Sequence, residues 1–219
     1  SNMTLGAVTL SQNGTVKSGS GIITIASVSG ANKLSLQDNT SNSRGLVVVN
    51  GAATIGQIET FAQNYAVSLL GTTTVTSAST FNNTGATTFG DGGNTVDTVT
   101  FTGGLTAKAG AVNLNSKLVT TNNLLDIGAV TLAGNSTLQS GTGTITVGSI
   151  TDGANSYTLN LQDGSGSGAA SQGSVIFSGD VTISAISTVA KTYAVSFQNN
   201  TTVDTATTFA NTAGVSFGK

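Results

Sequence analysis

The carboxylates of this 219-residue sequence are the side chains best suited to acid–base chemistry. There are nine acidic residues, of which only Glu59 is a glutamate, and the chain has neither His nor Cys. Ser–His–Asp and Cys–His arrangements are therefore impossible, and acid–base chemistry would need a pair of carboxylates. Asp91 and Asp97 form the only nearby pair outside a repeated element. They make a β-helical polysaccharide hydrolase or lyase the catalytic alternative.

The surroundings of these two aspartates favour a turn over an active site. Both lie among Gly and Asn residues, which are typical of turns. The string 90–97 also weakly resembles the calcium-binding nonapeptide of repeat-in-toxin proteins, but those sites need stacked copies and this string occurs once. Asp38 and Asp163 follow a repeated Leu-x-Leu-Gln motif, which predicts a strand-ending turn. We therefore expect no catalytic residue, no cofactor and no bound metal.

The composition predicts an all-β protein that folds. Charged residues make up only 7% of the chain, whereas hydrophobic residues make up 37%, so the chain has enough apolar surface to bury. Val, Ile and Thr are abundant, and their branched side chains favour strands. The net charge of −2 and the scattered basic residues argue against a nucleic-acid partner. No apolar run is long enough to span a membrane, and Ser1 and Asn2 before Met3 resemble a cloning remnant.

A long internal repeat organises the chain. Residues 5–10 (LGAVTL) return as residues 127–132 (IGAVTL), and residues 65–68 (YAVS) return as residues 193–196. The offset grows from 122 to 128 residues because the second copy carries extra residues at 151–157 and 164–171, where turns tolerate insertions. We interpret residues 3–219 as one continuous solenoid that contains a first unit, 3–126, and a truncated second unit, 127–219.

Within both copies the apolar positions alternate with variable ones, which is the pattern of half-buried strands. We expect the matched apolar residues to point inward: Val8, Leu10, Ile23, Ile25, Val47 and Val49 in the first copy, and Val130, Leu132, Ile145, Val147, Val175 and Phe177 in the second. Ile55, Ile58 and Phe61 have a helix-like spacing of three. Their counterpart, 183–189, is rich in Ser, Thr and Val and favours short strands around a bend.

Short strands separated by Gly, Asn, Ser and Asp clusters cannot bury themselves singly. Stacked as coils, each strand would pair in parallel with the next, which predicts a parallel β-solenoid of about ten coils with roughly 20 residues each. The alternative architecture is a pair of antiparallel β-sandwich domains of about 125 residues each. The lack of Pro and Trp makes the sandwich the weaker interpretation.

The strand-rich runs resemble a family of giant bacterial exoproteins. Residues 6–10 (GAVTL), 97–104 (DTVTFTGG) and 141–147 (GTGTITV) look like the β-strand repeats of filamentous-haemagglutinin-like adhesins and autotransporter passengers. The resemblance implies a right-handed β-helix with a structural or adhesive role at the bacterial cell surface or in secreted form. It implies a host or matrix glycan or protein as partner. Uncapped end strands would also allow end-to-end self-association.

Several other features carry weaker functional hypotheses. Thr-x-Thr pairs at 72–74, 100–102 and 144–146 would suit an ice-binding solenoid if they formed a flat array. Adhesion would lie in loops where the copies differ, at 39–44 with the single arginine Arg44 and at 164–172. Finally, packing inside the stack explains the recurring aromatic residues better than sugar binding does: Tyr65, Phe81, Phe89, Tyr193, Phe209 and Phe217.

Overall fold

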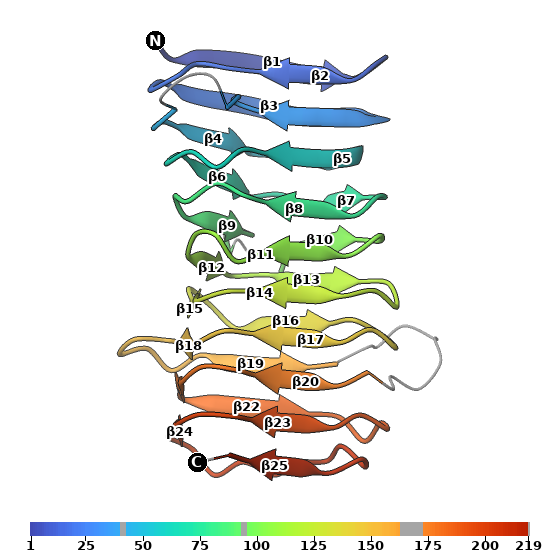
Figure 1. Cartoon of the computed structure of the whole chain (residues 1–219), viewed down its shortest axis with the longest axis vertical. Helices are drawn as coiled ribbons and strands as arrows, with labels where there is room; N and C mark the ends of the chain where they lie inside the picture. The colour runs from blue at the N-terminus through green and yellow to red at the C-terminus, as the bar shows by residue number, and fades with distance from the viewer. Residues whose placement is uncertain (40–42, 93–95, 163–172, 219) are drawn as a thin grey trace.

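The computed structural model of the protein describes residues 1–39, 43–92, 96–162 and 173–218. Over these residues the chain is all-β, and it winds into a β-solenoid of about ten turns. The termini lie at opposite ends of the stack (Figure 1). All strand pairs with a described register are parallel, so the antiparallel sandwich alternative is wrong.

Each coil contributes strands to three faces, and the strands of each face pair along the length of the rod. The first face consists of β1 (Met3–Thr9), β3 (Ile22–Leu36), β4 (Leu46–Val49), β6 (Ala66–Leu69), β9 (Thr87–Phe89), β12 (Val112–Leu114), β15 (Val130–Leu132), β18 (Ile150–Thr151), β21 (Val181–Ile183) and β24 (Thr201–Val203).

β1 and β3 are long enough to bend onto the second face as well. It continues with β5 (Ala53–Thr60), β7 (Thr73–Val75), β10 (Thr98–Phe101), β13 (Lys117–Thr120), β16 (Ser136–Gln139), β19 (Thr158–Leu161) and β22 (Ala185–Thr188). The third face holds the ends of β3 and β5 together with β2 (Gly14–Val16), β8 (Ser79–Phe81), β11 (Leu105–Ala107), β14 (Leu125–Ile127), β17 (Ile145–Val147), β20 (Val175–Phe177), β23 (Val195–Phe197) and β25 (Val215–Phe217).

The strand registers fix the coil length. Val47 pairs with Val67, and Val67 pairs with Thr87, so these coils take 20 residues each, as the sequence predicts. Longer coils carry their extra residues between strands. The step from Ile145 to Val175, for example, takes 30 residues and includes part of the chain outside the described residues. The strands keep their register because the additions fall in the connections.

The inward residues form one core that runs the length of the stack. Most strands have three or four residues in an alternating in-out-in pattern, and the predicted inward residues are buried, except Val8, which is partly buried in the first coil. Phe81, Phe89 and Phe101 meet edge to face at 5.7–5.9 Å between ring centres. The ambiguous segments around Ile58 and Ile186 are strands, as their composition predicts.

The sequence repeat is out of step with the coils. Ile23 lies on the first face, whereas its counterpart Ile145 lies on the third face. Leu34 lies on the third face and its counterpart Leu159 on the second. In both comparisons the second-copy residue lies five full coils and two further faces along the chain from its first-copy counterpart. Equivalent residues are therefore displaced by about 27 Å along the rod, at roughly 4.8 Å per coil, and they face another direction.

A buried glutamine closes one corner in each copy. Gln37 and Gln162 are fully buried and adopt positive φ values of 63° and 54°. Gln37 Oε1 accepts the backbone N–H of Ser18 at 2.9 Å, and Gln162 Oε1 accepts that of Ser140 at 3.0 Å. Each glutamine side chain thus accepts a hydrogen bond from a backbone N–H of the previous coil. Strand pairing does not reach this corner, so that N–H would otherwise be left unbonded.

A buried tyrosine secures a second corner. The Tyr65 hydroxyl accepts the N–H of Phe61 at 2.8 Å and donates to the carbonyl of Leu36 at 2.7 Å. Tyr193 makes the same pair of contacts with Val189 and Leu161, at 3.1 and 3.2 Å. Because the copies lie on different faces, one sequence device serves at different corners of the coil.

Candidate functional site

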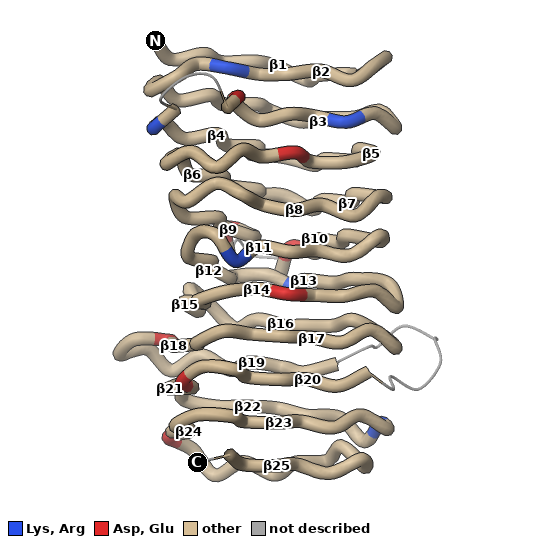
Figure 2. Tube along the Cα trace, viewed as in Figure 1, with Lys and Arg blue, Asp and Glu red and all other residues tan. Residues whose placement is uncertain are grey.

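Charged residues are sparse along the rod (Figure 2). The described ion pairs each join one coil to the next. Lys17 pairs with Asp38. The Lys33 Nζ lies 2.9 Å from Glu59 Oε2, and the Lys108 Nζ lies 3.3 Å from Asp126 Oδ2. Of these, the Lys33–Glu59 pair stands beside a concave, polar surface.

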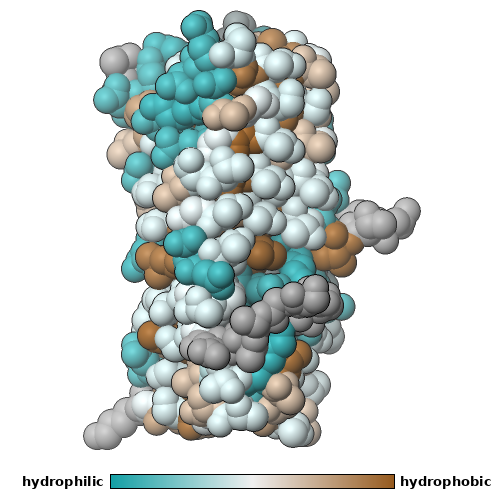
Figure 3. Space-filling model, turned by 90° about the vertical axis from the view of Figure 1, so that its right-hand side faces the viewer, coloured by the Kyte–Doolittle hydropathy of each residue, from teal (hydrophilic) through white to brown (hydrophobic). Residues whose placement is uncertain are grey.

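This surface is a groove on the edge between the second and third faces, over the first four coils. Figure 3 turns this edge toward the viewer, and hydrophilic residues gather over its N-terminal part. The groove encloses about 310 Å³ and is lined by Asn13, Ala31, Asn32, Lys33, Gly56, Gln57 and Ser77. We call it the amide groove. It follows a register shift between Gly30 and Lys33, where β3 bends against β5.

Successive coils each place polar side chains in the amide groove. Asn13 comes from the first coil, Lys33 from the second, Gln57 from the third and Ser77 from the fourth. Lys33 and Gln57 are direct partners in the strand register, so their backbones lie one strand spacing apart, roughly 4.8 Å. The groove therefore carries a column of hydrogen-bonding groups parallel to the rod axis.

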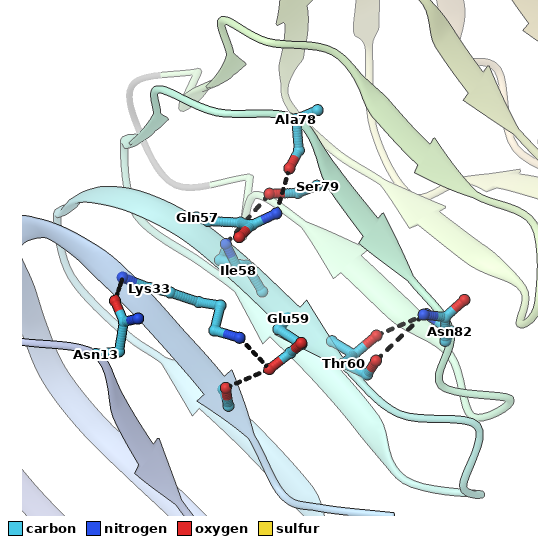
Figure 4. Close-up of polar contacts among 10 residues, drawn as sticks. Asn13, Lys33, Gln57, Ile58, Glu59, Thr60, Ala78, Ser79 and Asn82 are labelled. Carbon is cyan, nitrogen blue, oxygen red and sulfur yellow. Dashed lines mark hydrogen bonds and ion pairs between the residues drawn. The ribbon is translucent and has the colours of Figure 1, made fainter.

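Hydrogen bonds to the backbone hold these amides in place (Figure 4). Asn13 Oδ1 accepts the N–H of Lys33 at 3.0 Å, and Gln57 Nε2 donates to the carbonyl of Ala78 at 2.8 Å. Asn32 Nδ2 donates to the carbonyl of Leu10 at 2.8 Å. Each amide uses one of its two polar atoms in this way. The Asn13 Nδ2, Asn32 Oδ1 and Gln57 Oε1 atoms have no partner among the residues that the structure describes.

Glu59 is ionised and neutralises Lys33. The Ser35 hydroxyl donates to Glu59 Oε2 at 2.6 Å, and Lys33 reaches the same oxygen. The hydrogen bond from Ser35, followed by that from Lys33, holds the pKa of the Glu59 carboxyl below its ordinary value of 4.5. The two charges cancel, so this polar surface carries no net charge from the pair.

A less polar recess adjoins the amide groove. It encloses about 230 Å³ and is lined by Gly30, Ala31, Thr54, Ile55 and Thr76. Ala31 belongs to both hollows, which makes them neighbours on the same edge. The combined surface offers polar groups along one side and small apolar groups beside them.

The second copy lacks several polar side chains of the amide groove but keeps the asparagine hydrogen bond that aligns its strands. Asn135 Oδ1 accepts the N–H of Thr158 at 2.8 Å, as Asn13 does with Lys33. Thr158 pairs with Ala185 in register, as Lys33 pairs with Gln57. At the three matched positions Lys33, Gln57 and Glu59 of the first copy are thus replaced by Thr158, Ala185 and Ser187. The structure places all of these on strands, where sequence reasoning, which looked for differences in loops, missed them.

The structure brings Asp91 and Asp97 together. Burial is the main cause that raises the pKa of Asp97 above its ordinary value of 3.8, and the charge of Asp91 and a hydrogen bond between the two side chains raise it further. The polysaccharide-cleaving alternative, which would use these two carboxyls, stays a prediction.

The other predicted positions are only partly described. Asp38 pairs with Lys17, and the preceding Gln37 is the left-handed residue at the end of β3. Asp163 and the whole of the loop 164–172 lie outside the described residues, as do residues 40–42 of the loop 39–44.

The Thr-x-Thr pairs do not combine into a two-column array. Thr74 and Thr100 are register partners on the second face, but their companions Thr72 and Thr102 fall on opposite sides of this column. Thr146 belongs to the third face. A longer column lies on the first face, where Thr4, Thr24, Thr88, Thr131, Thr151, Thr182 and Thr202 occupy the outward centre of their strands, interrupted by Val48, Ser68 and Asn113.

Most of the recurring aromatic residues pack inside the stack. Tyr65, Phe81, Phe89 and Tyr193 are at most 2% exposed, and Phe209 is partly buried. Phe217 on β25 stacks on Phe197 at 5.0 Å and is 64% exposed. Its exposed face belongs to the last strand of its ladder.

Comparisons with protein-family models, with curated proteins and with solved structures found no match for this chain. Within the described ranges, no helix is long and apolar enough to cross a membrane. No group of three or more His, Cys, Asp or Glu side chains in those ranges could hold a metal ion.

Proposed function

We propose that this chain is a non-catalytic structural and adhesive segment of a large bacterial cell-surface or secreted protein. The observation that carries the proposal is the continuous stacking of coils on three parallel strand ladders. Each coil hydrogen-bonds to the next, and the buried residues form one core along the whole stack. About ten coils at roughly 4.8 Å each give a stiff spacer of about 45 Å.

The outward surface suits exposure to solvent outside a cell. Thr, Ser and Asn dominate the outward centres of the strands, and the chain has few charges. Such a surface is hydrophilic without a strong electrostatic field, so it would not bind nucleic acid or anionic lipid indiscriminately. The resemblance of the strand repeats to those of filamentous-haemagglutinin-like adhesins and autotransporter passengers supports the same function.

Surface labelling of intact cells tests this proposal. Antibodies raised against the purified chain should label unpermeabilised cells of the organism that encodes it, and external protease should remove the label. Beads coated with the chain should also attach to a glycan-rich or matrix-coated surface. Labelling that requires permeabilised cells, with no material in the medium, would contradict the location. Beads that attach to no such surface would contradict the adhesive role.

A further inference from the structure

We infer that the amide groove binds an uncharged oligosaccharide that lies along the rod axis across the first four coils. This inference rests on the adhesive part of the proposed function and names the ligand class and its site. The groove combines a concave surface, fixed amide side chains and an adjoining apolar recess.

The spacing of polar groups favours an extended chain of sugars. Asn13, Asn32 and Gln57 come from three successive coils and therefore repeat at roughly 4.8 Å along the axis. A sugar residue in an extended glycan has about the length of one such step. Each of these amides keeps one polar atom without a partner among the described residues, so the column offers both N–H donors and C=O acceptors. Sugar hydroxyls can both donate and accept, which matches this mixture.

The order of the site favours binding over simple solvation. The backbone hydrogen bonds of Asn13 and Gln57 restrict their side chains before any ligand arrives, so less conformational entropy is lost on binding. Lys33 is held by Glu59, and Glu59 by Ser35. The recess beside Ile55 can receive the apolar C–H face of a sugar ring.

The absence of net charge from the Lys33–Glu59 pair selects against acidic glycans. An acidic sugar beside Lys33 would have to compete with the Glu59 carboxylate, whose lowered pKa keeps it ionised at neutral pH. Repulsion between the two carboxylates would oppose binding. A neutral sugar can instead hydrogen-bond to both groups without breaking their ion pair.

Comparison of the two copies distinguishes the residues that the strands need from those that occur only in the amide groove. The second copy forms the same paired strands with Thr158, Ala185 and Ser187 in place of Lys33, Gln57 and Glu59. The polar residues are therefore not needed to form the coils, whereas Asn13 and Asn135 serve the strands in both copies. This difference also supplies the substitutions for a test that preserves the fold.

The test compares the full chain with a triple variant, K33T/Q57A/E59S, which installs the residues of the second copy. N-acetylglucosamine tetramer and cellotetraose are the neutral probes, and a galacturonic acid tetramer is the acidic probe. Binding is followed through the NMR signals of the side-chain amides. We expect the neutral probes to shift the Asn13, Asn32 and Gln57 signals of the unaltered chain, with a Kd on the order of 1 mM for so open a site. The triple variant should weaken this binding at least tenfold.

A matched variant controls for the number of substitutions. T158K/A185Q/S187E makes the reverse exchange in the second copy and should bind at least as tightly as the unaltered chain, because it leaves the amide groove untouched. The inference is overturned if neutral probes shift no groove signal, if both variants weaken binding equally, or if the acidic probe binds more tightly.

The bead assay distinguishes failure of this inference from failure of the proposed function. Beads that carry the triple variant and attach as well as the unaltered chain would reject the amide groove while leaving adhesion in place. Attachment lost in the triple variant alone supports the groove.

Discussion

Replacing Tyr65 with Phe tests whether the buried tyrosine secures its corner as the structure indicates. The change removes only the hydroxyl, so the ring still packs and no large cavity forms. It leaves the Phe61 N–H and the Leu36 carbonyl without their partner, and the second of these bonds is buried. An unsatisfied buried backbone group costs about 1–3 kcal/mol. Two fully buried groups would cost more, but the Phe61 N–H is only partly buried. We therefore expect Y65F to lower the free energy of unfolding by about 2–3 kcal/mol.

Urea titration measures this loss as a lower midpoint with an unchanged slope. Hydrogen exchange of the Phe61 amide adds a local measurement and should accelerate in Y65F. Y193F should lose less, since its hydroxyl makes longer bonds of 3.1 and 3.2 Å. Y157F is the control and should change stability by less than about 0.5 kcal/mol, because Tyr157 is only partly buried. An unaltered midpoint together with unaltered Phe61 exchange in Y65F would refute the reasoning.

The same hydroxyl predicts a loss of stability in alkali. Burial is the main cause that raises the pKa of Tyr65 above its ordinary value of 10.0, and burial does the same for Tyr193. The folded state therefore favours the neutral phenol. This contribution is fully present below pH 10 and is lost as the pH rises through the raised pKa. Y65F should remove part of the alkaline loss, and the combined variant Y65F/Y193F should remove more.

Three further predictions address the core, the acidic groups and the outer surface. F101A should lower the free energy of unfolding by about 3–5 kcal/mol in urea titrations, because it empties the centre of an aromatic cluster. E59Q should reduce stability at neutral pH but not well below pH 4.5, because the lowered pKa of Glu59 stabilises the fold only while the carboxyl is ionised. D97N should increase stability at neutral pH, because the raised pKa of Asp97 means that the folded state disfavours its ionised carboxylate. Ice crystals grown with the chain should keep their ordinary shape, because the longest outward Thr column, on the first face, is a single column with interruptions; faceted crystals would contradict this.

The inward residues could be predicted from the sequence because they depend on local alternation, whereas the coil length of roughly 20 residues was taken from known repeat families. Val47 and Val49 are spaced by two residues, and any strand with that spacing buries both on one side. The helix-like spacing around Ile58 was resolved correctly by its counterpart around Ile186, since strand-forming residues replace the helix formers there. Parallel stacking followed from the length of these strands, which are too short to bury themselves.

The corner devices could not be predicted, because they depend on contacts between coils. Nothing in the residues next to Gln37 indicates that its side chain reaches Ser18 in the previous coil. The repeated motif predicted a turn at Asp38, a usual turn residue, but gave no sign of the buried role of the preceding Gln37. The amide groove was missed for a similar reason, since Asn13, Lys33 and Gln57 are far apart in the chain and meet only through the strand register. A comparison of the two copies position by position on the strands would have revealed it.

The shift of the sequence repeat against the coils explains why the corner residues match between the two copies while many outward residues differ. A unit of five coils and two faces can repeat only if its corners are interchangeable, since each device must fit a different corner in the next copy. Gln37 and Gln162, or Tyr65 and Tyr193, meet this condition by bonding to the backbone of neighbouring coils, which is alike on every face. Outward side chains are under no such constraint. If further units follow the same step, equivalent positions would lie about 27 Å apart along the rod and two faces further round, so outward side chains at these positions would point in three directions. A tandem array with all its sites on one side would require units of a whole number of coils, and this sequence does not have them.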